Sequence, residues 1–150
     1  MPARFPERIV CLTEETTETL YLLGEERRIV GISGYTVRPA RARREKPRVS
    51  AFITARVDRI IGLKPDLVLG FSDLQADIAR DLARAGLNVV IFNQRSVDEI
   101  LSMILTLSSM VGAAEKGAAL VDRLDNELLA MREKAKAFPR RPREIGRAHV

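Results

Sequence analysis

Residues 60–93 constrain the fold more than any other stretch, because they contain a complete strand, turn, helix and strand. Residues 67–69 and 89–92 are short continuous apolar runs, which is typical of strands covered on both faces. Between these runs, four apolar side chains recur at helical spacing: Leu74, Ile78, Leu82 and Ala85. A helical crossover of this length between two buried strands predicts a right-handed parallel unit.

Capping signals mark the helices around this unit. Ser72 and Gln75 have the spacing of a capping box, and Gly86 fits the position just past a helix end. Ser96 and Glu99 repeat the capping-box pattern before an apolar helix that we expect to end near residue 112. The central part of the chain therefore alternates strand and helix, as α/β domains do.

The N-terminal part shows the same alternation of strand and helix. Residues 8–12 and 28–33 are compact apolar runs and are expected to be strands. Thr13 is expected to cap the intervening helix, and Gly24 to end it. Residues 34–55, with two prolines and many arginines, are expected to form a long loop outside the sheet. A short helix, capped by Thr54 and ended by Gly62, should lead into the central unit.

A long helical pattern closes the chain over residues 113–137. Four side chains form its apolar stripe: Leu120, Leu124, Leu128 and Met131. We predict a three-layer α/β lobe over residues 1–112, with helices on both faces of a parallel sheet, then a long linking helix over 113–137. Residues 138–150 lack any pattern and are expected to be either the truncated start of a second lobe or a foreign tail.

The scarcity of reactive side chains argues against an enzyme. Cys11 is the only cysteine and lies in an apolar run, so we expect a buried thiol and no internal disulfide. His149 is the only histidine and stands next to the last residue. No histidine-based triad, metal site or cofactor site is predicted, and we assign no catalytic and no metal-binding residue.

Charge and hydropathy limit the partners. The net charge of +5 arises mainly from residues 38–48 and 132–147, and these segments do not form a basic face with interleaved aromatic residues or a recognisable nucleic-acid-binding motif. We therefore expect no nucleic-acid binding. Residues 100–114 are the longest mostly apolar stretch, too short and too polar to span a bilayer, so no membrane insertion is expected. No apolar secretory region precedes the first expected strand, which leaves a cytoplasmic location open.

The candidate site follows from the predicted sheet. Ligands of open parallel sheets bind outside the carboxyl ends of the strands, and three of the few aromatic residues fall on or near those loops: Tyr35, Phe52 and Phe71. Aromatic rings there suit a large, flat, partly apolar ligand. The alternative for Phe52 and Phe71 is that they close the top of the core.

Three polar residues complete the candidate ligand-binding set. Glu14 and Glu15 are expected either to contact the ligand at the polar rim of the site or to be surface carboxylates that the helix dipole favours at a helix start. Ser72 is a further candidate, although helix capping also explains its presence. None of the three has the neighbours of a catalytic acid, base or nucleophile.

Several segments resemble the substrate-binding proteins of cobalamin and iron-siderophore ABC importers. Residues 8–12 with the acidic, threonine-rich helix that follows resemble the opening of these proteins. Residues 30–35 (Val-Gly-Ile-Ser-Gly-Tyr) resemble their next segment. Residues 57–69 (Val-Asp-Arg-Ile-Ile-Gly-Leu-Lys-Pro-Asp-Leu-Val-Leu) carry the strongest resemblance. The resemblance extends over residues 8–137.

The resemblance implies one lobe of a bilobal periplasmic-binding-protein fold, with ligand held between two lobes joined by a long helix. Tyr35, Phe52 and Phe71 match ligand-facing aromatic positions of cobalamin-binding relatives. Asp58 matches an acidic residue that pairs with arginines of the ABC importer permease. A periplasmic location and a monomeric full-length protein are also implied.

These observations predict a non-catalytic protein that binds cobalamin or a related metal chelate, such as haem or a siderophore, for delivery to an ABC importer. One alternative is an intracellular α/β enzyme or nucleotide-binding domain, which should supply a reactive cluster or phosphate loop at the strand ends. The other is a cytosolic corrinoid carrier or sensor with the same fold.

Overall fold

The computed structural model describes residues 4–51 and 54–140, and within them a parallel sheet of five strands. The strands lie in the order β3-β2-β1-β4-β5, and every neighbouring pair is parallel. Their bounds are β1 Ile9–Cys11, β2 Ile29–Ser33, β3 Arg48–Ser50, β4 Leu67–Phe71 and β5 Val89–Phe92. The predicted parallel α/β architecture is confirmed.

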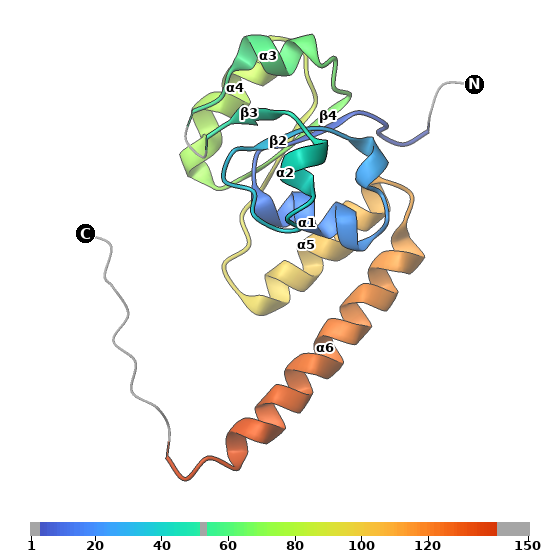
Figure 1. Ribbon diagram of the computed structural model, residues 1–150, viewed down its shortest axis with the longest axis vertical. Helices are drawn as coiled ribbons and strands as arrows, with labels where there is room; N and C mark the ends of the chain where they lie inside the picture. The colour runs from blue at the N-terminus through green and yellow to red at the C-terminus, as the bar shows by residue number, and fades with distance from the viewer. Residues whose placement is uncertain (1–3, 52–53, 141–150) are drawn as a thin grey trace.

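Helices connect the strands and cover both faces of the sheet (Figure 1). They are α1 Glu14–Leu22, α2 Ala42–Glu45, α3 Val57–Gly62, α4 Ala76–Arg84, α5 Val97–Met110 and α6 Ala114–Lys136, with single 3₁₀ turns η1 Glu26–Arg28 and η2 Asp73–Gln75. Alternation along β1 divides the core: Ile9 and Cys11 pack on the side of α1, α5 and α6, and Val10 on the side of α3 and α4. These are the predicted three layers.

The expectation of a long loop over residues 34–55 was wrong, because this segment contains α2 and the edge strand β3. Val49 is the only apolar residue of β3 and is buried, whereas Arg48 is exposed. An edge strand does not need a continuous apolar run. Thr54 does not cap α3 either, since Arg56 occupies the N-cap position.

At the other edge, β5 is only partly buried along its whole length. Its side chains nevertheless pack on both faces of the sheet, as predicted: Val90 and Phe92 against the core on the side of α1 and α5, and Val89 against the core on the side of α3 and α4. Among the described residues β5 pairs with β4 alone, and no strand lies on its outer side. A continuous apolar run marks a strand, but it does not tell an edge from a centre.

The two predicted capping boxes differ in detail. Ser96 Oγ accepts a hydrogen bond from the Glu99 amide (3.2 Å), as predicted. Ser72 Oγ accepts one from the Leu74 amide (3.2 Å), but the Gln75 side chain accepts from the Phe71 amide (2.9 Å) rather than from Ser72. Ser72 has φ +68°, so the chain leaves β4 through a sharp turn, and the next helix opens with η2.

Helix α6 packs on α5 near its start and then extends away from the rest of the chain (Figure 1). Gly117, Leu120 and Val121 are its buried residues. Further along the predicted apolar stripe, Leu124 and Leu128 are half-buried and Met131 is 65% exposed. The later part of the stripe is thus uncovered in this structure. A linking role for α6 stays a prediction.

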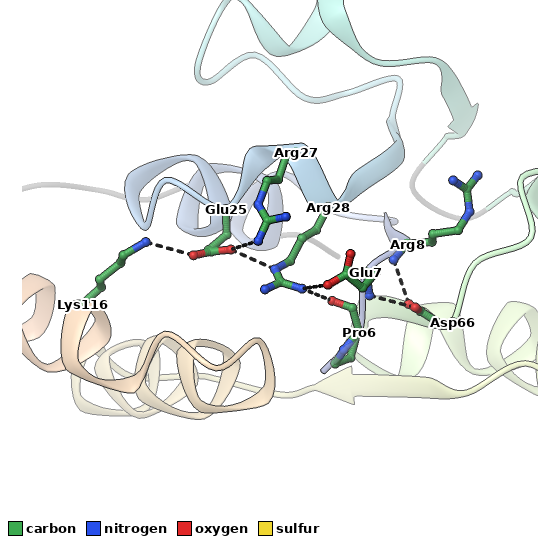
Figure 2. A network of polar contacts seen from close by, with 8 residues as sticks. All are labelled: Pro6, Glu7, Arg8, Glu25, Arg27, Arg28, Asp66 and Lys116. Carbon is green, nitrogen blue, oxygen red and sulfur yellow. Dashed lines mark hydrogen bonds and ion pairs between the residues drawn. The ribbon is translucent and has the colours of Figure 1, made fainter. Parts of the chain in front are cut away.

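A polar network fixes the start of α6 to the lobe (Figure 2). The carboxylate of Glu25 accepts from Lys116 Nζ in the first turn of α6 (2.9 Å) and from Arg28 Nε (2.8 Å). Arg28 Nη1 also donates to the carbonyl of Pro6 (2.6 Å). Glu25 and Arg28 are each only 7% exposed, so one network joins the N-terminal segment, the α1–β2 connection and α6.

Candidate functional site

The candidate site lies at the carboxyl edge of the sheet, where sequence reasoning placed it. Tyr35 follows β2 by two residues, and Phe71 is the last residue of β4. Both strands pair with β1 in parallel, so the two aromatic residues belong to the same edge, on either side of β1. Phe52 lies outside the described residues.

Among the described aromatic residues at this edge, Tyr35 is the most exposed, with 66% of its surface accessible. A tight turn holds it there: the Tyr35 amide donates to Ser33 Oγ (3.2 Å), and the Thr36 amide donates to the Ser33 carbonyl (3.1 Å). Ser33 and Thr36 are themselves buried. The turn therefore anchors its ends in the lobe and leaves the ring free to meet a ligand.

Phe71 is partly buried, and an arginine lies over one face of its ring. The guanidinium carbon of Arg95 lies 4.9 Å from the centroid of the Phe71 ring. Arg95 Nη2 also lies 3.7 Å from Asp73 Oδ1, and the Arg95 side chain remains 59% exposed. The ring and the guanidinium form a flat unit that offers both apolar area and charged donors.

Sequence reasoning missed Arg95. The signal was present in its position, because Arg95 stands three residues after the end of β5 and so belongs to the same edge as Phe71. Beside it, a pocket of about 230 Å³ is lined in part by Phe92, Gln94 and Glu99. The buried Oε1 of Gln94 has no hydrogen-bond partner among the described residues.

The two glutamates at the start of α1 differ in their surroundings. Glu14 Oε1 accepts from the Arg38 amide (3.1 Å) and lies 3.6 Å from Arg38 Nε, while Arg38 Nη2 lies 3.3 Å from Glu18 Oε2. Glu14 thereby ties the loop after Tyr35 to α1. Glu15 Oε1 is buried without a hydrogen-bond partner among the described residues. Ligand contacts by either carboxylate stay predictions.

Ser72 is 1% exposed, and its hydroxyl oxygen caps the turn that begins at Asp73. Its predicted ligand contact is not tested by these bonds. Asp58 lies in the first turn of α3 with its side chain 72% exposed. A hydrogen bond from Arg56 (3.3 Å) is the main cause that lowers the pKa of Asp58.

The described residues contain no group of three or more histidine, cysteine or acidic side chains placed to hold a metal ion. Cys11 is fully buried, and burial raises the pKa of its thiol to about 12, which keeps the sulfur protonated and unreactive. No helix in the described part of the chain is long and apolar enough to cross a membrane.

A parallel α/β lobe whose open edge presents rings and a guanidinium defines a ligand-binding lobe. Comparison with protein families identifies which kind. Residues 9–143 match the family model described as periplasmic binding protein, and the chain belongs to that family. This confirms the predicted resemblance.

Individual relatives agree with this assignment. The chain is 31% identical over 137 residues to the uncharacterised ABC transporter substrate-binding lipoprotein YvrC of Bacillus subtilis, covering 89% of this chain and 43% of the relative. It superimposes on the periplasmic vitamin B12 binding protein BtuF of Vibrio cholerae with a TM-score of 0.78 and 26% identity, covering 88% of this chain and 52% of BtuF.

The periplasmic haem-binding protein RhuT of Roseiflexus sp. RS-1 is also similar, with a TM-score of 0.79 and 25% identity, covering 91% of this chain and 52% of RhuT. The chain thus spans about half the length of the relatives that it matches.

Proposed function

We propose that this chain supplies one ligand-facing lobe of a protein that binds cobalamin or a related metal chelate, such as haem or a siderophore, and delivers it to an ABC importer. The names of the relatives support this ligand class, since BtuF binds vitamin B12 and RhuT binds haem. The partners would be the small-molecule ligand and the permease of the importer. The full-length protein would be a monomer and would act in the periplasm.

The placement of Tyr35 and Phe71 carries the proposal. The two residues flank β1 at the open edge of the sheet, and α6 does not fold back over this edge (Figure 1). A flat chelate laid across the edge would contact both rings, with the Arg95 guanidinium and the Tyr35 hydroxyl as polar partners. No bond needs to form or break for such a protein to act.

A single lobe should bind its ligand weakly. A site between two lobes buries the ligand from both sides, and one wall alone removes about half of that area from water. We therefore expect weak affinity for the present chain. In the docking step, Asp58 on α3 is proposed as a contact to the permease, because its side chain is exposed and charged.

Absorbance titrations with cyanocobalamin and with hemin test the proposal. Tyr35→Ala and Phe71→Ala should each weaken binding roughly tenfold, because a ring that buries about 60 Å² on the ligand contributes roughly 1.5 kcal/mol. Phe138→Ala is the matched control: Phe138 is an exposed ring beyond the end of α6, and Tyr35 and Phe138 are each 66% exposed. Equal affinities in all three variants, or no binding of either chelate, would contradict the proposal.

A further inference from the structure

A pocket of about 260 Å³ lies between the end of β3 and the start of α3, away from the unit of Phe71 and Arg95. Three arginines from both elements line it: Arg48, Arg56 and Arg59. Ser50 and Ala51 supply backbone and small side chains to the same wall. Three guanidinium groups around one hollow make a strongly positive environment.

The charge of these arginines is only partly compensated. Arg56 pairs with Asp58, with 3.3 Å between Arg56 Nη2 and Asp58 Oδ2. Neither Arg48 nor Arg59 has a carboxylate within 4.0 Å among the described residues. The pocket and its rim therefore carry an excess of two positive charges, even with Asp58 counted.

Ser50 gives a second, independent sign of a missing partner. Its hydroxyl oxygen is buried and has no hydrogen-bond partner among the described residues. A buried hydroxyl without a partner costs free energy that an incoming polar group would recover. An oxyanion in the pocket would accept from the guanidinium groups, and a change of the Ser50 rotamer would let its hydroxyl donate as well.

We infer that this pocket receives a carboxylate side chain of the protein on which the lobe docks, which under the proposed function is the importer permease. The inference rests on that proposed function for the identity of the partner. Asp58 alone would predict a partner surface rich in arginine. Arg48 and Arg59 beside it have no carboxylate partner among the described residues and suit an acidic group, so the proposed docking surface presents both signs.

The shape of the site favours a protein carboxylate over a membrane surface. A hollow of this size admits one protruding Asp or Glu side chain, which arginine can bind through two parallel hydrogen bonds. A membrane surface attracts broad clusters of exposed basic residues, and the described arginines at this site are grouped around one hollow. Anionic vesicles thus become a control rather than the expected partner.

Hexaglutamate is the probe, titrated at low ionic strength into the isotope-labelled chain while backbone amide shifts are recorded by NMR. We expect the largest shifts at Ser50, Ala51 and Arg59, and a dissociation constant about fivefold higher in the Arg48→Gln/Arg59→Gln double variant. The matched control is Arg84→Gln/Arg132→Gln, which removes the same charge from two exposed arginines elsewhere. Hexalysine should produce no shifts at the pocket.

Three outcomes would overturn the inference. The two double variants could weaken hexaglutamate binding equally, or the unmodified chain could bind phosphatidylglycerol vesicles but not hexaglutamate. The third is that Arg48→Gln/Arg59→Gln loses hemin and cobalamin binding together with hexaglutamate binding. The last would make the pocket part of the ligand site. If the unmodified chain binds hexaglutamate at the pocket but neither chelate, the proposed ligand class fails and the carboxylate pocket stands.

Discussion

Lys116 Nζ lies 2.9 Å from Glu25 Oε1, and this contact joins residues that are 91 positions apart in the sequence. It ties the first turn of α6 to the end of α1, and the second oxygen of Glu25 holds the nearly buried Arg28. The orientation of the long helix is thus set by a polar cluster as well as by apolar packing.

We expect Glu25→Gln to destabilise the fold by roughly 1–3 kcal/mol, because the nearly buried Arg28 would lose its buried charged partner and keep only the half-exposed Glu7. Denaturant unfolding followed by circular dichroism measures this change. Glu127→Gln is the control, since Glu127 forms an exposed pair with Arg123, and it should change the stability by less than about 0.5 kcal/mol. Similar losses in both variants would show that the cluster is unimportant.

The same carboxylate makes stability depend on pH. Burial acts to raise the pKa of Glu25, but hydrogen bonds from Arg28 and Lys116 outweigh it and leave the pKa below its ordinary value of 4.5. A lowered pKa in the folded state adds stability above pH 4.5, and this part is lost as the pH falls through the folded-state value. Unfolding midpoints of the unmodified chain should therefore decline more steeply below pH 4.5 than those of Glu25→Gln.

Gly117 sets how closely α6 approaches α5. A Cβ atom at this position would overlap the side chain of Ser108 on α5. Gly117→Ala should thus separate the two helices and cost roughly 1–3 kcal/mol. In Gly62→Ala, by contrast, the added methyl group meets nothing within 4 Å, and the change should be neutral or stabilising by up to about 1 kcal/mol. Thermal unfolding of the two variants measures the difference in stability. A Gly117→Ala protein as stable as the unmodified chain would contradict the close contact between α5 and α6.

The thiol of Cys11 should be inert in the folded chain. It is fully buried, and burial raises its pKa to about 12. A thiol-specific chromogenic reagent at neutral pH should label no cysteine in the native protein and one per chain in denaturant. Rapid labelling under native conditions would mean that β1 opens readily.

Arg95 should influence ligand choice. It lies over the Phe71 ring and offers charged donors at the sheet edge, so Arg95→Gln should weaken hemin, which carries two carboxylates, more than the uncharged corrin of cyanocobalamin. The difference should be about threefold to tenfold, as expected for one charge-assisted contact that remains partly exposed. Arg84→Gln, which removes an exposed arginine from α4, should change neither affinity.

Apolar periodicity was sufficient for four of the five strands and for the long helices, because buried strands and amphipathic helices leave distinct patterns. It failed at β3, where Val49 alone is buried in a three-residue edge strand. The position of Tyr35 and Phe71 at one edge followed from the predicted sheet. The stacking of Arg95 on Phe71 depends on side-chain rotamers, which a sequence pattern does not specify.

The 23 residues of α6 form a continuous rod about 35 Å long, and its buried residues, Gly117, Leu120 and Val121, lie near its base. A tilt of about 5° about a pivot near Gly117 would move the C-terminal end of α6, about 28 Å away, by roughly 2.5 Å. A group attached at this end of α6 would therefore move farther than the side chains whose repacking near Gly117 caused the tilt.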